Sequence, residues 1–187
     1  MIVVSYYTPD YAHFAVDLVS DLERLGIAHD VREVPDLGSW QANTRRKPTF
    51  LRKMLNEHGA PVVWIDADAR VDAYPQILDE VGEKTDVSFH VFRLAGGRAE
   101  PLSGTVWVSS RSFLRAWEYE MREAPDAWDQ VAMGRAANGY LVQELPPAYC
   151  WIQGIFDKPF YERNNPGAGP PVIRHFQASR QKRGVKA

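Results

Sequence analysis

The sequence is poor in the features that define several protein classes. It contains one cysteine, Cys150, among 187 residues, which excludes an intramolecular disulfide and any zinc site built from several cysteines. No run of about 18 apolar residues is present to span a membrane. The first residues, Met-Ile-Val-Val, pass at once into polar sequence rather than into a signal peptide. We therefore expect a protein of the reducing cytoplasm, without a transmembrane segment.

A strong excess of one charge is also absent. The formal net charge is −2, so the overall electrostatics give no reason to expect nucleic acid as a partner. The charge is uneven, however, because residues 174–187 contain five basic residues and no acidic one. Length and an apolar content of 45% fit a single domain, 1–187, in which residues 178–187 form a basic, flexible tail.

The most informative stretch is 61–70, with the sequence PVVWIDADAR. Its four consecutive apolar residues, three of them β-branched, predict a buried strand. Asp66 and Asp68 follow this strand, and in an extended chain positions i and i+2 point to the same side. A hard divalent cation such as Mn²⁺ or Mg²⁺ would relieve the repulsion between two such carboxylates. The alternative is that both acids simply enter a polar loop.

The start of the chain predicts a β-α-β unit. Residues 1–7 form a β-branched run, residues 11–25 carry apolar side chains at helical spacing, and residues 27–34 alternate weakly as a second strand. Such a unit implies a parallel sheet with a right-handed crossover, and its ligands bind at the carboxyl ends of the strands. The residues expected beside such a site are Tyr6, Tyr7, Thr8, Tyr11, Glu33 and Asp36.

The rest of the chain continues to alternate between helices and strands. Helices are expected at 48–58, 74–81, 112–122 and 128–137, and strands at 86–92, 102–108, 141–145 and 172–173. Thr44 and Ser112 are the expected caps of two helices, and residues 35–43 are expected to form a loop. The predicted fold is α/β, with a mostly parallel, mixed central sheet flanked by helices.

The order of motifs resembles that of GT-A-fold glycosyltransferases, which use nucleotide-diphospho-sugars. The matching pieces are RKPTFL at 46–51, VWIDADA at 63–69, SGTVWV at 103–108, WDQ at 128–130, LPPAYCW at 145–151 and VIRHF at 172–176. The resemblance implies a single-domain, Rossmann-like GT-A fold and transfer of a sugar from a nucleotide donor, with a UDP-sugar expected. The chain is shorter than most such enzymes, and Leu102 replaces the usual asparagine before Ser103-Gly104, which leaves the acceptor hydroxyl unidentified.

The same resemblance implies a metal site. Asp68 would bind a divalent cation directly, and Asp66 would hold it through water or would hold the ribose hydroxyls. His175 would be a third protein ligand, and an imidazole on an oxygen-rich ion favours Mn²⁺ over Mg²⁺. Taken alone, His175 is equally consistent with a surface histidine beside a basic tail.

Glycosyl transfer builds negative charge on the leaving diphosphate, and cations can neutralise it. Lys47 and Arg45 would serve this purpose, as would Arg180 and Lys182 from the tail. The tail would either close over the donor and exclude water or remain a frayed terminus.

The base of the donor would stack on Tyr7 or Tyr11, beside Thr8, and would form a hydrogen bond near Asp36. Ser103 is also expected in the donor site.

The candidate catalytic residues are Asp129 and Gln130. In an inverting enzyme Asp129 would deprotonate the acceptor hydroxyl, whereas in a retaining enzyme either residue would orient the sugar. The simpler alternative for Asp129 is a helix N-cap.

Three other functions remain open at this point. A phosphotransferase of the haloacid-dehalogenase type also carries Asp-x-Asp after a hydrophobic strand, although normally on the first strand. A nucleotide-sugar-binding module would keep the fold without turnover. Nucleic-acid binding through the tail is the weakest of the three, and it would be steeply salt-dependent.

Overall fold

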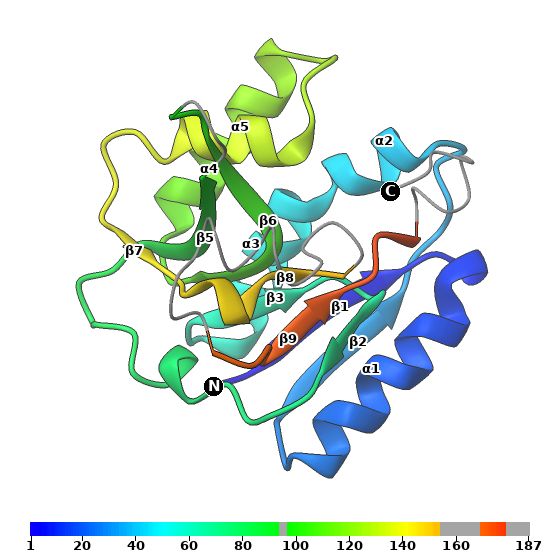
Figure 1. Ribbon diagram of the computed structural model, residues 1–187. Coiled ribbons are helices and arrows are strands. Elements are labelled where there is room, and N and C mark those ends of the chain that lie inside the picture. Colours follow the sequence, from blue (N-terminus) through cyan, green and yellow to red (C-terminus); the bar gives the residue numbers. More distant parts are fainter. Residues whose placement is uncertain (94–96, 154–168, 179–187) are drawn as a thin grey trace.

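The computed structural model describes residues 1–93, 97–153 and 169–178, and a six-stranded sheet forms its centre (Figure 1). The strand order is β2-β1-β3-β6-β5-β7. The strands are β1 (Val3–Tyr7), β2 (His29–Glu33), β3 (Val62–Ile65), β5 (Val87–Arg93), β6 (Ala99–Val108) and β7 (Val142–Glu144). All of them run parallel except β6, which is antiparallel to both β3 and β5. The predicted mixed, mostly parallel sheet is therefore confirmed.

A smaller sheet lies beside the first one. It has the order β4-β9-β8, with β4 (Ala69–Val71) antiparallel to β9 (Ile173–His175) and β8 (Trp151–Ile152) parallel to β9. Because β4 begins directly after Asp68 and β9 ends at His175, this sheet brings the two most distant parts of the predicted metal site together.

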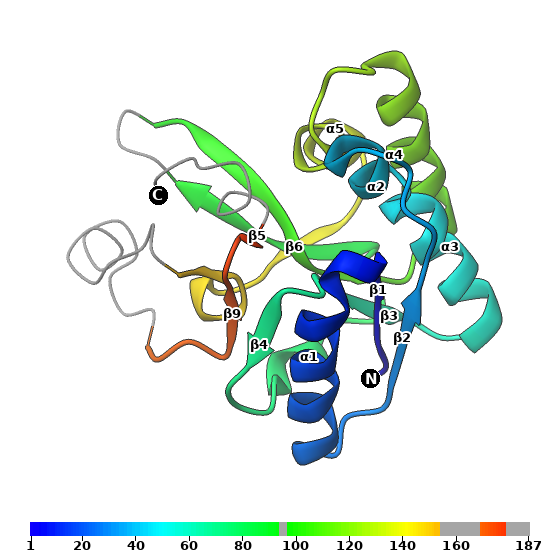
Figure 2. The same ribbon diagram turned by 90° about the vertical axis from the view of Figure 1, so that its right-hand side faces the viewer.

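Helices cover the two faces of the central sheet differently (Figures 1 and 2). On one face, α1 (Ala12–Arg24) and the small sheet pack over residues such as Val3 and Val63. On the other face lie α3 (Lys47–His58), α4 (Arg111–Glu123) and α5 (Asp129–Ala136), which pack over Val4 and Trp64. The short α2 (Trp40–Arg45) lies before α3, from which Arg46 alone separates it.

Local sequence explains the elements nearest the site. All four residues of β3 are buried, as expected for a strand covered on both faces. Gly59 ends α3 in a left-handed conformation, with φ of 63°, which a glycine adopts without strain. Since β1 lies between β2 and β3 and is parallel to both, the carboxyl ends of β1 and β3 meet at one edge of the sheet.

The structure differs from the sequence-based expectations at several elements. Residues 35–43 are not simply a loop, because Ser39 caps α2 there and its Oγ accepts a hydrogen bond from the backbone N of Ala42. Thr44 accordingly lies inside α2 and caps no helix. Ser110, not Ser112, caps α4. The helix expected at 74–81 shrinks to the 3₁₀ turn η2 (Gln76–Leu78).

The Asp66-Ala67-Asp68 motif was also wrongly expected to be extended. The chain turns there, and the backbone N of Ala69 donates to the carbonyl O of Asp66 at 3.0 Å. The two carboxylates are therefore positioned by a tight turn between β3 and β4 rather than by strand alternation.

No helix within the described ranges is both long enough and apolar enough to cross a lipid bilayer.

Candidate active site

A cleft of about 640 Å³ opens at the edge where β1 and β3 end. Its walls come from the ends of β1 and β3, the start of β6, helix α2, the start of α5, and β9. The predicted site residues that line it are Tyr6, Tyr7, Thr8, Tyr11, Asp36, Lys47, Asp66, Asp68, Ser103, Asp129, Gln130 and His175, whereas Glu33 is not among the lining residues. Most of the candidates chosen from sequence thus face one cavity, although they are spread over the chain from residue 6 to residue 175.

Asp66 is fixed in place by three contacts. Its backbone N donates to the carbonyl O of Gly104 at 2.9 Å. Its Oδ1 accepts from Trp64 Nε1 at 2.7 Å and from Lys47 Nζ at 3.0 Å. These contacts fix the orientation of the carboxylate in the cleft.

Asp68 lies in a less favourable environment for a negative charge. Burial, together with the nearby charge of Asp66, raises the pKa of Asp68 to about 6. Its Oδ2 accepts one hydrogen bond, from the backbone N of Ala178 at 2.8 Å. A carboxylate so placed gains from a nearby cation, because a cation favours its ionised form.

His175 is buried, with 4% of its surface exposed. Its Nε2 lies 2.9 Å from Thr105 Oγ1, whereas its buried Nδ1 has no hydrogen-bond partner among the described residues. Burial lowers the pKa of His175 to about 4, so the ring is neutral at physiological pH. The tautomer that donates from Nε2 to Thr105 leaves Nδ1 as a free lone pair, which is the form that binds metals.

Gly104 makes this position of His175 possible. A Cβ atom at residue 104 would lie 2.8 Å from both Cε1 and Nδ1 of the imidazole. Only glycine allows β6 and His175 to approach so closely, and the SGT motif therefore has a steric reason in this chain.

The candidate ligand atoms of Asp66, Asp68 and His175 suit a divalent cation, but the described residues do not form a preassembled metal site. No group of three or more His, Cys, Asp or Glu side chains among them is close enough to hold an ion as it stands. The chemistry nevertheless fits, since an unpaired imidazole nitrogen and two adjoining carboxylates share the cleft.

Lys47 is the central buried cation of the site. Its Nζ lies 3.0 Å from Asp66 Oδ1 and 2.9 Å from Asp129 Oδ2, and it also donates to the carbonyl O of Ser103 at 3.1 Å. Burial alone would lower the pKa of Lys47, but the charges of Asp129 and Asp66 outweigh it and raise the pKa above its usual value. Lys47 thus joins the carboxylate after β3 to the carboxylate at the start of α5.

Asp129 is buried at the first residue of α5 and does not act as its cap, a position that Trp128 occupies. Its Oδ2 accepts from Ser103 Oγ at 2.8 Å and pairs with Lys47, while no described residue donates to its Oδ1. Gln130 donates from Nε2 to Glu100 Oε1 across the cleft wall. These two residues therefore present fixed polar groups next to the Asp66 turn.

Another part of the cleft wall follows the end of β1. Thr8 Oγ1 donates to Asp10 Oδ1 at 2.6 Å, and Tyr7 and Tyr11 line the wall on either side. Asp36 accepts from Asn43 Nδ2 at 2.8 Å and from the backbone N of Gly38 at 2.9 Å. The Asp36 carboxylate is therefore engaged in shaping its own loop.

Arg45 does not reach the cleft, contrary to the expectation that it binds phosphate. Its Nη1 donates to the carbonyl O of Pro125 at 2.9 Å, with longer contacts to the carbonyls of Ala124 and Ala127. It therefore fastens α2 to the connection between α4 and α5. The tail residues Arg180 and Lys182 lie outside the described residues.

Comparison with known proteins agrees with this architecture. No family model matches the sequence, and no curated protein matches it either. Among solved structures, a glycosyltransferase involved in glycosylation of the major capsid of PBCV-1 is similar, with a TM-score of 0.69, 13% identity, and coverage of 97% of each chain. The chain has the GT-A fold.

Two further GT-A glycosyltransferases show the same likeness. The galactosyltransferase LgtC, determined with donor and acceptor sugar analogues, has a TM-score of 0.64 at 11% identity, over 95% of this chain and 87% of that one. The bifunctional glycosyltransferase WbbM has a TM-score of 0.62 at 13% identity, over 95% of this chain and 45% of that one.

Several residues of the cleft in this GT-A fold escaped the sequence analysis. Trp40 and Trp128 both line the cleft, with ring centroids 6.2 Å apart and planes at 84°. The signal for Trp40 was the Ser39 cap, which would have revealed α2. The sequence places Trp128 only within the WDQ motif, and no local pattern predicts that its side chain is exposed.

Proposed function

We propose that this chain is a metal-dependent glycosyltransferase that moves a sugar from a nucleotide-diphosphate donor, with a UDP-sugar as the expected donor, to a hydroxyl acceptor. The observation that carries the proposal is the convergence of Asp66, Asp68 and the unpartnered Nδ1 of His175 on one cleft of a GT-A fold. The three residues come from two elements about a hundred residues apart in the chain, the β3–β4 turn and β9, so that clustering in sequence does not account for their convergence.

The charge of the cleft supports a cation-assisted reaction. Among the described lining residues, six carboxylates face two basic side chains, Lys47 and Arg98. The carboxylates are Asp10, Asp36, Asp66, Asp68, Glu100 and Asp129. Because Lys47 is already paired with two of them, an anionic donor would be repelled without additional positive charge.

Asp66, Asp68 and His175 would supply that charge by holding Mn²⁺ or Mg²⁺. Such an ion, when bound, would act as a Lewis acid that neutralises charge on the leaving diphosphate. Lys47 serves the same site indirectly, since it fixes the Asp66 and Asp129 carboxylates relative to each other.

Asp129 and Gln130 would bind and orient the transferred sugar or the attacking hydroxyl. Ser103 and Lys47 occupy Asp129 Oδ2, which leaves Oδ1 to accept a hydrogen bond from a hydroxyl group. Because Asp129 is buried and held on two sides, it offers a preorganised acceptor rather than a mobile one. Tyr7, Thr8 and Tyr11 would flank the base where β1 ends.

The haloacid-dehalogenase alternative loses support, because the motif follows the third strand of a GT-A sheet and Trp64 and Lys47 occupy Oδ1 of its first aspartate. A nucleotide-sugar-binding module without turnover shares the whole of the proposed site. Release of the sugar to an acceptor would separate the two.

Calorimetric titration of UDP in the presence of Mn²⁺ and then of EDTA tests the proposal. We expect binding with Mn²⁺ alone, and loss of that binding in Asp68→Asn. Asp17→Asn removes an exposed carboxylate from α1, outside the cleft, and should bind UDP as the parent does. Equal binding of UDP by Asp68→Asn and the parent would contradict the assignment of the metal site.

A further inference from the structure

Two indoles line the cleft: that of Trp128, which is exposed, and that of Trp40, which is half-buried. Trp128 is 46% exposed and lies immediately before Asp129 in the chain. Trp40 begins α2 and meets Trp128 edge to face. An exposed indole in a cleft offers a ligand a large, rigid apolar face together with an N–H donor.

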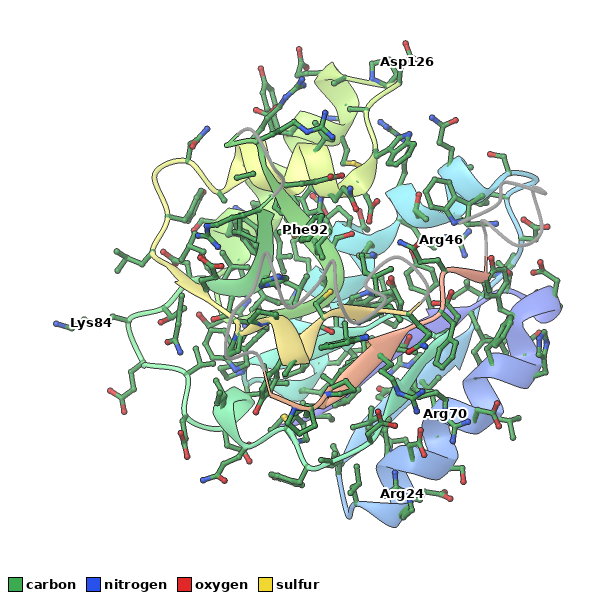
Figure 3. All side chains as sticks on the ribbon, in the orientation of Figure 1. Arg24, Arg46, Arg70, Lys84, Phe92 and Asp126 are labelled. Carbon is green, nitrogen blue, oxygen red and sulfur yellow. The ribbon has the colours of Figure 1, made fainter. Side chains whose placement is uncertain are left out.

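The two indoles are held by a shared support. Arg45, five residues after Trp40 at the last position of α2, donates to the carbonyl O of Pro125 in the connection that leads to Trp128. The carbonyl of Trp128 in turn accepts from the backbone N of Val131 and of Ala132. Figure 3 shows Asp126, in the same connection, at the outer end of the molecule, far from Arg24 on α1. The pair is thus held by contacts that do not involve Asp66, Asp68 or His175.

We propose that Trp40 and Trp128 form the acceptor platform of this enzyme and that its acceptor is an uncharged saccharide. The inference rests on the proposed function and names the substrate class of the same site. Stacking of the sugar ring on Trp128 would place one of its hydroxyl groups beside Asp129 and Gln130, the next two residues.

The chemistry of a pyranose matches this surface. One face of the ring presents C–H groups that pack against an indole, and the rim presents hydroxyls. The carboxylates that line the cleft disfavour a phosphorylated or carboxylated acceptor, because the described lining offers Arg98 as its one basic side chain besides the paired Lys47. An uncharged ring therefore fits both the aromatic pair and the charge of the cleft.

The two indoles differ in their distance along the chain from the expected base residues. Trp128 adjoins Asp129 at the start of α5, whereas Tyr7 and Tyr11 follow β1. Trp40 lies four residues after Asp36 and shares α2 with Asn43, which donates to Asp36. A role in stacking the base would make both tryptophans necessary for UDP binding, and this can be measured directly.

Saturation-transfer NMR with simple glycosides tests the proposal. The probes are methyl α-glucopyranoside, methyl α-mannopyranoside and methyl β-galactopyranoside, with sorbitol as an acyclic polyol that has hydroxyls but no ring. The titrations use the full chain with UDP and Mg²⁺, because Mn²⁺ would broaden the signals. We expect at least one glycoside to bind and sorbitol not to bind.

The variants are Trp128→Ala, Trp128→Phe, Trp40→Ala and, as a matched control, Tyr119→Ala, which removes a 51% exposed aromatic outside the cleft lining. Trp128→Ala should bind the glycoside about tenfold more weakly. Trp128→Phe should recover part of this loss, and Trp40→Ala should behave like Trp128→Ala. Arg45→Ala, which removes a positioning residue, should also weaken glycoside binding.

UDP binding by calorimetry, measured on every variant, keeps the two proposals distinguishable. Unchanged UDP binding in Trp128→Ala, with weakened glycoside binding, supports the platform. Loss of UDP binding in that variant would assign the indoles to the nucleotide and overturn the inference. Glycoside binding as in the parent, or binding of sorbitol as strong as that of the glycosides, would overturn it too. Failure of the parent to bind UDP would instead remove the proposed function and this inference with it.

Discussion

The carboxylate of Asp21, which contacts β4, and the carboxylates of the cleft next to β4 differ in how fully their charges are paired. Asp21, on α1, accepts from Arg70 Nε at 2.6 Å, from Arg24 Nη2 at 3.1 Å and from the backbone N of Val71 at 3.1 Å. Burial alone would raise the pKa of Asp21, but these hydrogen bonds outweigh it and lower the pKa. Figure 3 shows Arg24 and Arg70 on the α1 side of the molecule.

The cluster in the cleft is left incomplete by comparison. The pKa of Asp68 is raised, and the Nδ1 of His175 has no partner among the described residues. We infer from this difference that a fully paired buried charge stabilises the fold, whereas incompletely paired polar groups in a cleft indicate a ligand-binding site. The Asp21 cluster also fixes Arg70 and Val71 of β4, so the satisfied charges hold the unsatisfied ones in place.

The largest loss of stability is expected at Lys47, which lies in the cleft but is fully paired with two carboxylates, those of Asp66 and Asp129. Lys47→Ala would leave Asp66 and Asp129 with no buried cation, which should lower the free energy of unfolding by about 3–5 kcal/mol. Urea denaturation measures this. Lys53→Ala, on the exposed side of the same helix, should change stability by no more than about 0.5 kcal/mol. A mild effect at Lys47 would mean that the pair is not truly buried.

Asp21→Ala should be the next most severe change, with no direct effect on the cleft. It would remove the hydrogen-bond acceptor of the Arg70 side chain and of the Val71 backbone N. We therefore expect a loss of about 3 kcal/mol in unfolding free energy. Asp17→Ala, one turn earlier on α1 and more exposed, is the control. The comparison fails if Asp21→Ala keeps its stability and yet loses metal-dependent UDP binding.

Gly104→Ala should sharpen the assignment of His175. The new Cβ would lie 2.8 Å from the imidazole, so the ring must shift at a cost of about 2 kcal/mol. We expect metal-dependent UDP binding to weaken with it. Gly82→Ala meets nothing nearer than 3.6 Å and should leave both quantities unchanged. Normal UDP binding by Gly104→Ala would argue against His175 as a ligand.

The smallest effect concerns His90, which lies outside the cleft lining and whose buried Nε2 has no hydrogen-bond partner in the part of the chain that the structure describes. Burial lowers the pKa of His90, although the Leu145 carbonyl and Glu144 act in the opposite direction. The unfolded chain therefore binds a proton that the folded one does not. Above pH about 6.5 His90 is neutral in both the folded and the unfolded chain, and stability does not depend on its protonation. Below that pH the unfolded chain takes up the proton, and the free energy of unfolding falls by at most about 1.4 kcal/mol per pH unit.

His90→Asn should accordingly flatten the fall in stability between pH 6.5 and pH 5, measured by urea denaturation at several pH values. UDP binding should not change, because His90 does not line the cleft in which UDP is proposed to bind. If UDP binding changed in His90→Asn, position in the cleft would not distinguish the imidazole of His175 from that of His90, and the comparison would fail.

Sequence alone predicted the parts of the fold whose pattern is local. The apolar run of β3 and the helical spacing of α1 each depend on neighbouring residues, so both elements were found. The small sheet was not predicted as a unit, because β4 and β9 are about a hundred residues apart and each has three residues. A strand was expected at 172–173, but its pairing with β4 depends on the tertiary fold and leaves no local pattern.

The same limit explains the site. Asp66, Asp68 and Asp129 were found because acids after a strand or at a helix start are conspicuous. Lys47 and Arg45 were both assigned to phosphate, whereas the structure pairs Lys47 with carboxylates 19 and 82 residues away and Arg45 with carbonyls about 80 residues away. A basic residue next to a helix start shows its charge in the sequence, but its partners depend on the tertiary fold.

Arg46 alone separates α2 from α3, and this narrow junction has a consequence for how such an enzyme diverges. The helix before it carries Trp40, and the helix after it begins with Lys47. Under the proposed acceptor role of Trp40, substitutions at Trp40 would alter the preferred acceptor, whereas substitutions at Asn43, which donates to Asp36, would also disturb the proposed donor site. A laboratory library that varies the first residues of α2 and keeps Asn43 would therefore test new acceptors with the proposed donor site intact.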